Sequence, residues 1–551
     1  MKSNSSIDKE SLQNEKEIKK NKEHSSMVKK YISNRRTIFE SKTENKSNGI
    51  RYKYKRYSLP SNINVDNEID IIKIMDKMKT SLDELKSDLK FSQNKKWNIS
   101  DELKENLILI RKELSKENIP INKIKNILAH NIQDFVDILI ELIDNIKDDS
   151  LELEILWILN NIIYFASKNK DENLDSIKIF NQISKFYLIQ IKKTNEFRYS
   201  LIEKMHRIFG NLLFINNKSI YNLLNNNIIT NIIEFLNSPV VSFRLSCLWL
   251  LNKILIALKE NDDVNNYINL FINKFAIYNY NFIFLRINKI EIDEISEFFW
   301  LLSELSKYDS NILIPIFFNG FERFENYEKI IQNFEFVLNN SMIKKLSQIS
   351  FRLISNILVV CYNDLNNEYL LNKFIENFFE KKSVILYIND ILNSPINKYD
   401  IYLVKDVLLL IFNLVCISSV KSSIYFKKGI VNLISDRDYQ NNKDIMKLLF
   451  MIFYQILISN YYSFELNDEK VIKTCLTLIK RFNTDENILI IFIDILYFYL
   501  ENTNTIINDE LLNELEYIKK ERNPKIESYQ NIFEKLSIIV KKSSHLTNFL
   551  K

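Results

Sequence analysis

The chain has 551 residues, which is more than one hydrophobic core normally organises, so its length predicts either several domains or a modular repeat array. Only four Gly and six Pro occur in the whole chain, and this scarcity of helix breakers favours an array of long helices joined by polar loops. The formal net charge is +5, and no uncharged apolar run reaches the roughly 18 residues of a membrane span, so we expect a soluble, intracellular protein without membrane insertion.

Residues 1–65 are predicted to form a flexible, basic and largely disordered arm. Residues 1–57 contain 16 Lys and Arg against 7 Asp and Glu, a net charge of +9, whereas the remaining residues contain 59 against 63, a net charge of −4. A basic arm on a mildly acidic body can bind nucleic acid or an acidic protein surface, fold back onto its own body, or stay a solvated tail. Charge alone leaves these alternatives open.

From residue 66 to residue 540 the apolar positions recur at helical spacing, and no alternating strand pattern competes. The phrase Leu-Asn-Ser-Pro occurs at 236–239 and 392–395, each time before a long apolar helix, and predicts the end of one helix and a turn before the next. The long helices align on one polar position, occupied in turn by Asn161, Asn211, Asn252, Glu304, Asn356 and Asn413. The intervals of 50, 41, 52, 52 and 57 residues are typical of armadillo or HEAT repeats with lengthened loops. Residues 541–551 would be a C-terminal tail.

The first clear repeat helix, LELEILWILNNII (151–163), places Trp157 and Asn161 at i and i+4 on one face. An extended peptide in a groove presents unpaired backbone groups, and the amide of Asn can donate to and accept from them without reading sequence. Indole faces can form slots for the aliphatic stems of Lys and Arg, while carboxylates at the rim bind the charged heads. The pattern therefore indicates a surface for an extended, cationic peptide.

Four phrases carry a family resemblance by their order and spacing; they are LIRKELSKENIPI (109–121), EKMHRIFGNL (203–212), SFRLISNI (350–357) and ILIIFIDILYFYL (488–500). Over about residues 105 to 540 the chain resembles importin-α, the family of adaptors that carry nuclear-localisation signals. The resemblance implies an armadillo-repeat, right-handed superhelical solenoid of about nine or ten repeats. It also implies a nuclear import adaptor whose cargo-peptide contacts would be Trp157, Asn161, Glu203, Asn211, Asn252, Glu297, Trp300, Arg352, Asn356, Asp406 and Asn413.

The segment RRTIFESKTENKSNGIRYKYKR (35–56) resembles the importin-β-binding arm of that family. The matching residues are Arg35, Arg36, Phe39, Arg51, Lys53, Lys55 and Arg56. The resemblance implies importin-β as a second partner, an export receptor that recycles the adaptor, and shuttling between cytoplasm and nucleus. The alternation of Tyr with Lys and Arg in residues 51–57 would also suit single-stranded nucleic acid, although the acidic body argues against nucleic acid as a partner.

Several positions depart from the family pattern. Where the family has Trp, this chain has Arg207, Leu248 and Leu409, and Trp249 is displaced by one residue, which predicts that it faces the core. Ile215 replaces the family aspartate that pairs with a buried lysine of the signal. These departures favour an alternative function, an armadillo scaffold that binds a different extended partner.

No catalytic, cofactor or metal motif is evident. The four cysteines lie far apart, which argues against a disulfide framework or a zinc site, and the four histidines are scattered. His206, next to Arg207, is expected on a helix surface. With no Gly-rich phosphate loop or nucleophile elbow, we expect a protein that is not an enzyme and needs no cofactor.

Overall fold

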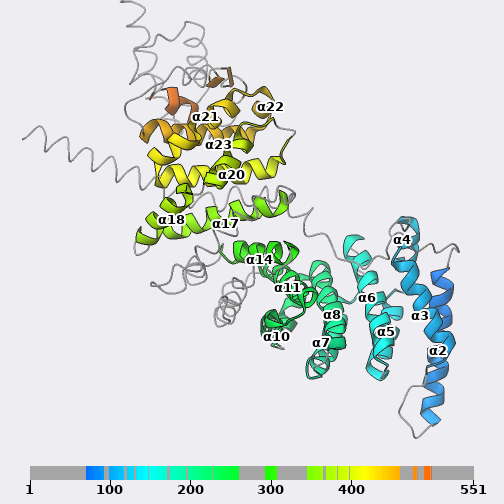
Figure 1. Ribbon diagram of the computed structural model, residues 1–551. Helices are drawn as coiled ribbons and strands as arrows, with labels where there is room; N and C mark the ends of the chain where they lie inside the picture. Colours follow the sequence, from blue (N-terminus) through cyan, green and yellow to red (C-terminus); the bar gives the residue numbers. More distant parts are fainter. Residues whose placement is uncertain are drawn as a thin grey trace, which may run out of the picture. The chain divides into compact units, whose positions relative to one another are not determined.

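The computed structural model describes residues 70–91, 99–259, 292–306 and 344–459 and short pieces between 474 and 498; small gaps lie at 117–118, 120, 130–131, 147, 170–173, 194–195, 226, 364–367, 381 and 396–397. In this part of the chain every regular element is a helix (Figure 1), which confirms the predicted all-α fold. The predicted basic arm, with its importin-β-binding residues, and the C-terminal tail lie outside the described residues.

The described helices belong to two compact units. The first unit contains α2 (Ile71–Phe91), α3 (Asp101–Leu114), α4 (Ile121–Ala129), α5 (Ile132–Asn145), α6 (Asp149–Asn169), α7 (Ser176–Gln190), α8 (Glu196–Ile215), η1 (Asn217–Ser219), α9 (Ile220–Asn225), α10 (Ile228–Glu234), η2 (Phe235–Asn237), α11 (Val241–Lys259) and α14 (Ile292–Leu305). The second contains α17 (Lys344–Asn363), α18 (Glu368–Glu380), α19 (Lys382–Leu392), α20 (Ile401–Ile417), α21 (Ser419–Ser435), α22 (Arg437–Gln440) and α23 (Lys443–Ser459).

Each unit is a stack of repeats in two layers. In the first unit α3, α6, α8, α11 and α14 pack each against the next, and α2, α5, α7 and α9 form a neighbouring layer. In the second unit α17, α20 and α23 pack in the same way, with α19 and α21 beside them. We call α3, α6, α8, α11, α14, α17, α20 and α23 the core series. Several repeats, such as α4–α5–α6 and α18–α19–α20, contain three helices, the arrangement of armadillo-type repeats.

Side-chain caps and turns define the helix boundaries. Ser100 precedes α3 and its hydroxyl accepts a hydrogen bond from the Leu103 amide at 3.2 Å. Asp175 and Asp400 cap α7 and α20 in the same manner, each satisfying one amide that the first turn leaves without a helical partner. Each Leu-Asn-Ser-Pro phrase contains the last residue of a helix, Asn237 of η2 and Leu392 of α19, and precedes a helix of the core series, as predicted.

Two glycines mark places where helices approach closely. Gly210 lies within α8, where a Cβ would be 2.5 Å from Cη2 of Trp249 on α11. Gly429 lies inside α21, where a Cβ would be 2.8 Å from Cβ of Leu392 on α19. The missing side chain allows close packing that a longer residue would prevent.

One helix of the described part, α11 over Val241–Leu258, is long and apolar enough to cross a membrane by length and composition alone. In the structure 78% of this segment is buried, and α11 packs between α8 and α14. Its cation Arg244 is bonded to both carboxylate oxygens of Glu294 on α14, at 2.6 and 2.9 Å. This is the environment of a central helix in a repeat stack.

Candidate peptide-binding face

In each unit, part-exposed side chains follow the helices of the core series at helical spacing. On α6 it includes Leu153, Glu154, Trp157 and Tyr164, and on α8 Tyr199, Glu203, Arg207 and Phe214. On α14 it includes Ser296 and Glu297, and on α17 Gln348, Arg352 and Asn356. We call these side chains the ladder face of each unit. It includes the predicted contact residues Trp157, Glu203 and Glu297 in the first unit and Arg352 and Asn356 in the second.

Trp157 is half-buried on α6, and both helices that flank α6 place a cation over its indole ring. The guanidinium carbon of Arg111, on α3, lies 4.9 Å from the ring centroid. Nζ of Lys204, on α8, lies 4.5 Å from the same centroid. Both distances are within the range of a cation–π interaction, so Trp157 is an aromatic slot for cationic stems, and the chain supplies two of its own.

The cations at this slot lie among carboxylates. Arg111 forms an ion pair with Glu154, one turn before Trp157 on α6. Arg207 pairs with Glu203 at 2.7 Å along α8, so the predicted acidic contact Glu203 binds the residue that replaced the family Trp. Burial lowers the pKa of Lys204 to about 7, and the positive charges of Arg207 and Arg111 act in the same direction. The opposing contributions of Glu203 and Glu154 only partly offset this.

Asn161, Asn211, Asn252 and Asn413 are buried, and each amide donates to a neighbouring helix of the core series. Nδ2 of Asn161 donates to the Leu114 carbonyl and the Ser115 hydroxyl, both at 3.2 Å. Nδ2 of Asn211 donates to Oδ1 of Asn160 at 3.2 Å.

Nδ2 of Asn252 donates to the backbone and side chain of Glu297, at 3.0 and 2.9 Å, and Nδ2 of Asn413 donates to the Ser355 carbonyl and hydroxyl, at 3.3 and 2.6 Å. These predicted peptide contacts thus connect adjacent repeats.

Arg352 and Asp406, also predicted as cargo contacts, bind each other. The guanidinium donates to both carboxylate oxygens of Asp406 at 3.1 to 3.2 Å, and Gln348 donates to the same carboxylate at 2.9 Å. Burial raises the pKa of Asp406, and Arg352 offsets part of that effect. The pair joins α17 to α20, so the acid expected at the rim lies in the interior of the stack.

The remaining predicted residues divide between surface and core. Asn356 is half-buried on α17, whereas Trp300 is 3% exposed on α14. Trp249 is also 3% exposed, as its displacement by one residue predicted. Of the residues that replace family positions, Leu248 is buried and Leu409 and Ile215 are part-exposed.

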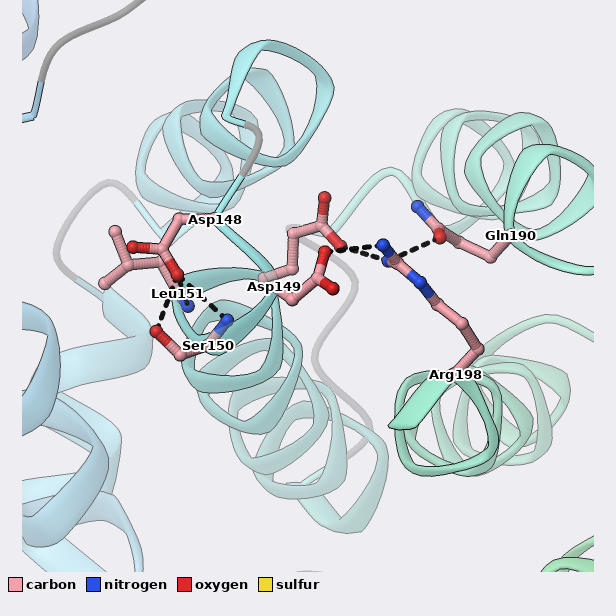
Figure 2. A network of polar contacts seen from close by, with 7 residues as sticks. Asp148, Asp149, Ser150, Leu151, Gln190 and Arg198 are labelled. Carbon is pink, nitrogen blue, oxygen red and sulfur yellow. Dashed lines mark hydrogen bonds and ion pairs between the residues drawn. The ribbon is translucent and has the colours of Figure 1, made fainter. Parts of the chain in front are cut away.

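Sequence reasoning missed the cations that hold the repeats together. Arg198, at the start of α8, donates to Glu152 at 3.0 Å, to Gln190 at 2.8 Å and to Asp149 at 2.5 Å (Figure 2). It therefore joins α6, α7 and α8. The residues that Arg198 binds lie on other helices, and the same is true of Arg111 and Lys204, which contact Trp157 on α6. Helical spacing within one segment therefore could not predict these contacts.

His206 is fully buried, so its expected place on a helix surface was wrong. Its ring lies 3.3 Å from the Tyr187 hydroxyl and 3.0 Å from the Ser246 hydroxyl, and it stacks on Phe243. Burial lowers the pKa of His206 to about 3, which keeps the ring neutral. Among the described residues, no three or more His, Cys, Asp or Glu side chains lie together in a group that could hold a metal ion.

No protein-family model and no curated protein matches the chain. Among solved structures the chain is similar to an engineered protein from the Northeast Structural Genomics Consortium, with a TM-score of 0.50 and 12% identity, over 87% of this chain and 99% of that one. The chain is an all-α repeat solenoid. A designed armadillo repeat protein in complex with the peptide (KR)4 matches at a TM-score of 0.36 and 11% identity, over 52% of this chain and 100% of that one. A second engineered protein from the consortium matches at a TM-score of 0.36 and 16% identity, over 53% and 99%.

Proposed function

We propose that this chain is a protein-binding adaptor, not an enzyme, and that the ladder face holds an extended segment of a partner protein. The observation that carries the proposal is the slot at Trp157. A half-buried indole that already stacks cations at 4.5 and 4.9 Å has the chemistry needed for the stem of a lysine or arginine from a ligand. Repeat solenoids commonly use a long surface of equivalent helices to bind extended partners.

The specific form of the proposal is a nuclear import adaptor. The sequence resemblance to importin-α supports nuclear-localisation signals of cargo proteins as ligands, importin-β as the carrier that binds the basic arm, and an export receptor that returns the adaptor to the cytoplasm. Such a protein would shuttle between cytoplasm and nucleus.

A second candidate function is a scaffold for a different extended partner. It is favoured by the way the structure uses the predicted contact residues. The amides of Asn161, Asn211 and Asn413 bond to neighbouring helices, and Arg352 neutralises Asp406. A ligand without lysine would use the part-exposed residues between these buried bonds.

Fluorescence anisotropy with the full chain separates the two functions. A labelled lysine-rich signal peptide and a peptide of equal length with each lysine replaced by glutamine are titrated with wild-type protein and with Trp157→Ala. The adaptor function requires the lysine peptide to bind more tightly and Trp157→Ala to weaken it. Equal or stronger binding of the glutamine peptide would contradict the adaptor and support the scaffold. Binding of single-stranded nucleic acid with a steep salt dependence would contradict both.

A further inference from the structure

The Trp157 slot contains two cations, one from each flanking helix. Arg111 is tied to Glu154 by an ion pair, and its side chain is 15% exposed. Lys204 is 8% exposed, and its ammonium lies over the ring. The carboxylates of Glu203 and Glu154 attract this ammonium and the guanidinium groups of Arg207 and Arg111 repel it, but burial is the largest effect and lowers its pKa. Desolvation and like charge make this a costly place for an ammonium ion.

We propose that Lys204 is a built-in competitor that sets the specificity of the ladder face. Its stem and ammonium take the place on Trp157 that a lysine side chain of a bound segment would occupy. A cationic ligand must displace Lys204 into water, which lowers its affinity, whereas a ligand with an uncharged side chain at this point does not need the slot. The inference rests on the proposed function, because it assumes that a segment binds this face.

The geometry identifies Lys204, not Arg111, as the group that yields. An ammonium on a four-carbon stem can rotate out to solvent, and leaving the slot relieves its desolvation. Arg111 would have to abandon Glu154, leaving a part-buried carboxylate without that partner. Lys204 is therefore the position at which one substitution should open the slot.

The test compares three variants of the full chain. Lys204→Ala empties the slot; Lys204→Met removes the charge but keeps an unbranched side chain of similar length over the ring. Lys178→Ala is a matched control, because it removes a lysine from α7 that is paired with Asp137 at 2.7 Å, away from Trp157. Circular dichroism would confirm that each variant is folded.

Two probes are used with each variant. The first is the labelled lysine-rich peptide, followed by anisotropy. The second is n-butylammonium, which reproduces the lysine stem and head, followed by tryptophan fluorescence at constant ionic strength with Trp157→Phe as the signal control. We expect Lys204→Ala to bind both probes about tenfold more tightly than wild type, and Lys204→Met and Lys178→Ala to show little gain.

Equal affinity of wild type and Lys204→Ala for n-butylammonium would overturn the proposal. So would a gain in Lys204→Met as large as in Lys204→Ala, because charge rather than occupancy would then be the cause. If Lys204→Ala gains affinity for n-butylammonium but no folded variant binds either peptide, Lys204 does fill the slot, and it is the proposed function that fails.

Discussion

Gly210 lies in the middle of α8, where alanine would ordinarily be the better residue. Glycine in a helix interior is about 1 kcal/mol less favourable than alanine, because it loses more backbone freedom on folding. A substitution that introduced only a methyl group into open space would therefore raise stability. The Gly210→Ala variant tests whether the close packing between α8 and α11 turns this expected gain in stability into a loss.

The structure leaves little room for the added methyl group. A Cβ at residue 210 would lie 2.5 Å from Cη2 of Trp249 and 3.4 Å from Cγ of Lys253. The indole of Trp249 is 3% exposed, and Nζ of Lys253 lies 5.2 Å from its centroid, so the ring has little space to move. Overpacking of this kind costs about 1–3 kcal/mol. After the gain in helix propensity is subtracted, Gly210→Ala should lose up to about 2 kcal/mol.

Urea unfolding followed by far-UV circular dichroism measures the effect as a shift in midpoint, since a long repeat array need not unfold in one step. The same substitution is then made in a Trp249→Leu background, which removes the ring. There, Gly210→Ala should stabilise the protein or leave it unchanged. A higher midpoint for Gly210→Ala in the wild-type background would refute the close approach of α8 and α11.

Three further predictions concern ionisable groups. Because the folded pKa of His206, about 3, is depressed, the unfolded chain binds more protons between about pH 6.5 and pH 3. The stability that neutral His206 contributes should therefore fall by about 1.4 kcal/mol per pH unit on acidification in urea unfolding, and His206→Phe should reduce the acid slope by that amount. Arg352→Ala should cost about 3 kcal/mol in the same assay, because it leaves Asp406 buried without its cation, while removal of the exposed Lys79 should have no measurable effect. The pKa of Lys204 is about 7, but the neutral amine still fills the slot, so the affinity for the lysine peptide should change little between about pH 6 and about pH 8, in wild type as in Lys204→Met; a rise confined to wild type would assign the effect to charge. The charged groups that face the Lys204 ammonium are Arg111, Glu154, Glu203 and Arg207.

The helical architecture was predictable because it depends on patterns within short segments. Apolar spacing, the scarcity of Gly and Pro, and the two Leu-Asn-Ser-Pro phrases all act locally, and the helices begin and end near these signals. Predictions failed where a distant helix decided the outcome. His206, expected on a helix surface, is buried because α7 and α11 supply its hydrogen-bond partners.

The roles of the predicted peptide contacts were harder to predict from sequence than the helices were, for a physical reason. An Asn at a fixed position of every repeat can pair with a ligand or with the next helix, and both uses produce the same spacing in the sequence. Burial and the identity of the partner distinguish the two uses, and both depend on residues one repeat away. For Asn161 the partners are Leu114 and Ser115, more than 40 residues earlier in the chain.

Asn413 and Asn356 offer a direct test of this distinction, because they occupy the same predicted repeat position on α20 and α17. Asn413 is 7% exposed and donates to Ser355 at 2.6 and 3.3 Å, so Asn413→Ala leaves a buried hydroxyl and carbonyl without that donor and should cost about 1–3 kcal/mol in urea unfolding. Asn356 is part-exposed, so Asn356→Ala should cost clearly less stability.

Peptide binding by the same two variants then assigns their roles. A residue that serves the ladder face should weaken peptide binding without lowering the unfolding midpoint, and a residue that joins repeats should do the reverse. Asn356 is expected to behave in the first way and Asn413 in the second. If Asn413→Ala leaves stability unchanged but abolishes peptide binding, the hydrogen bonds to Ser355 do not hold the repeats together, and the Asn413 amide binds the peptide.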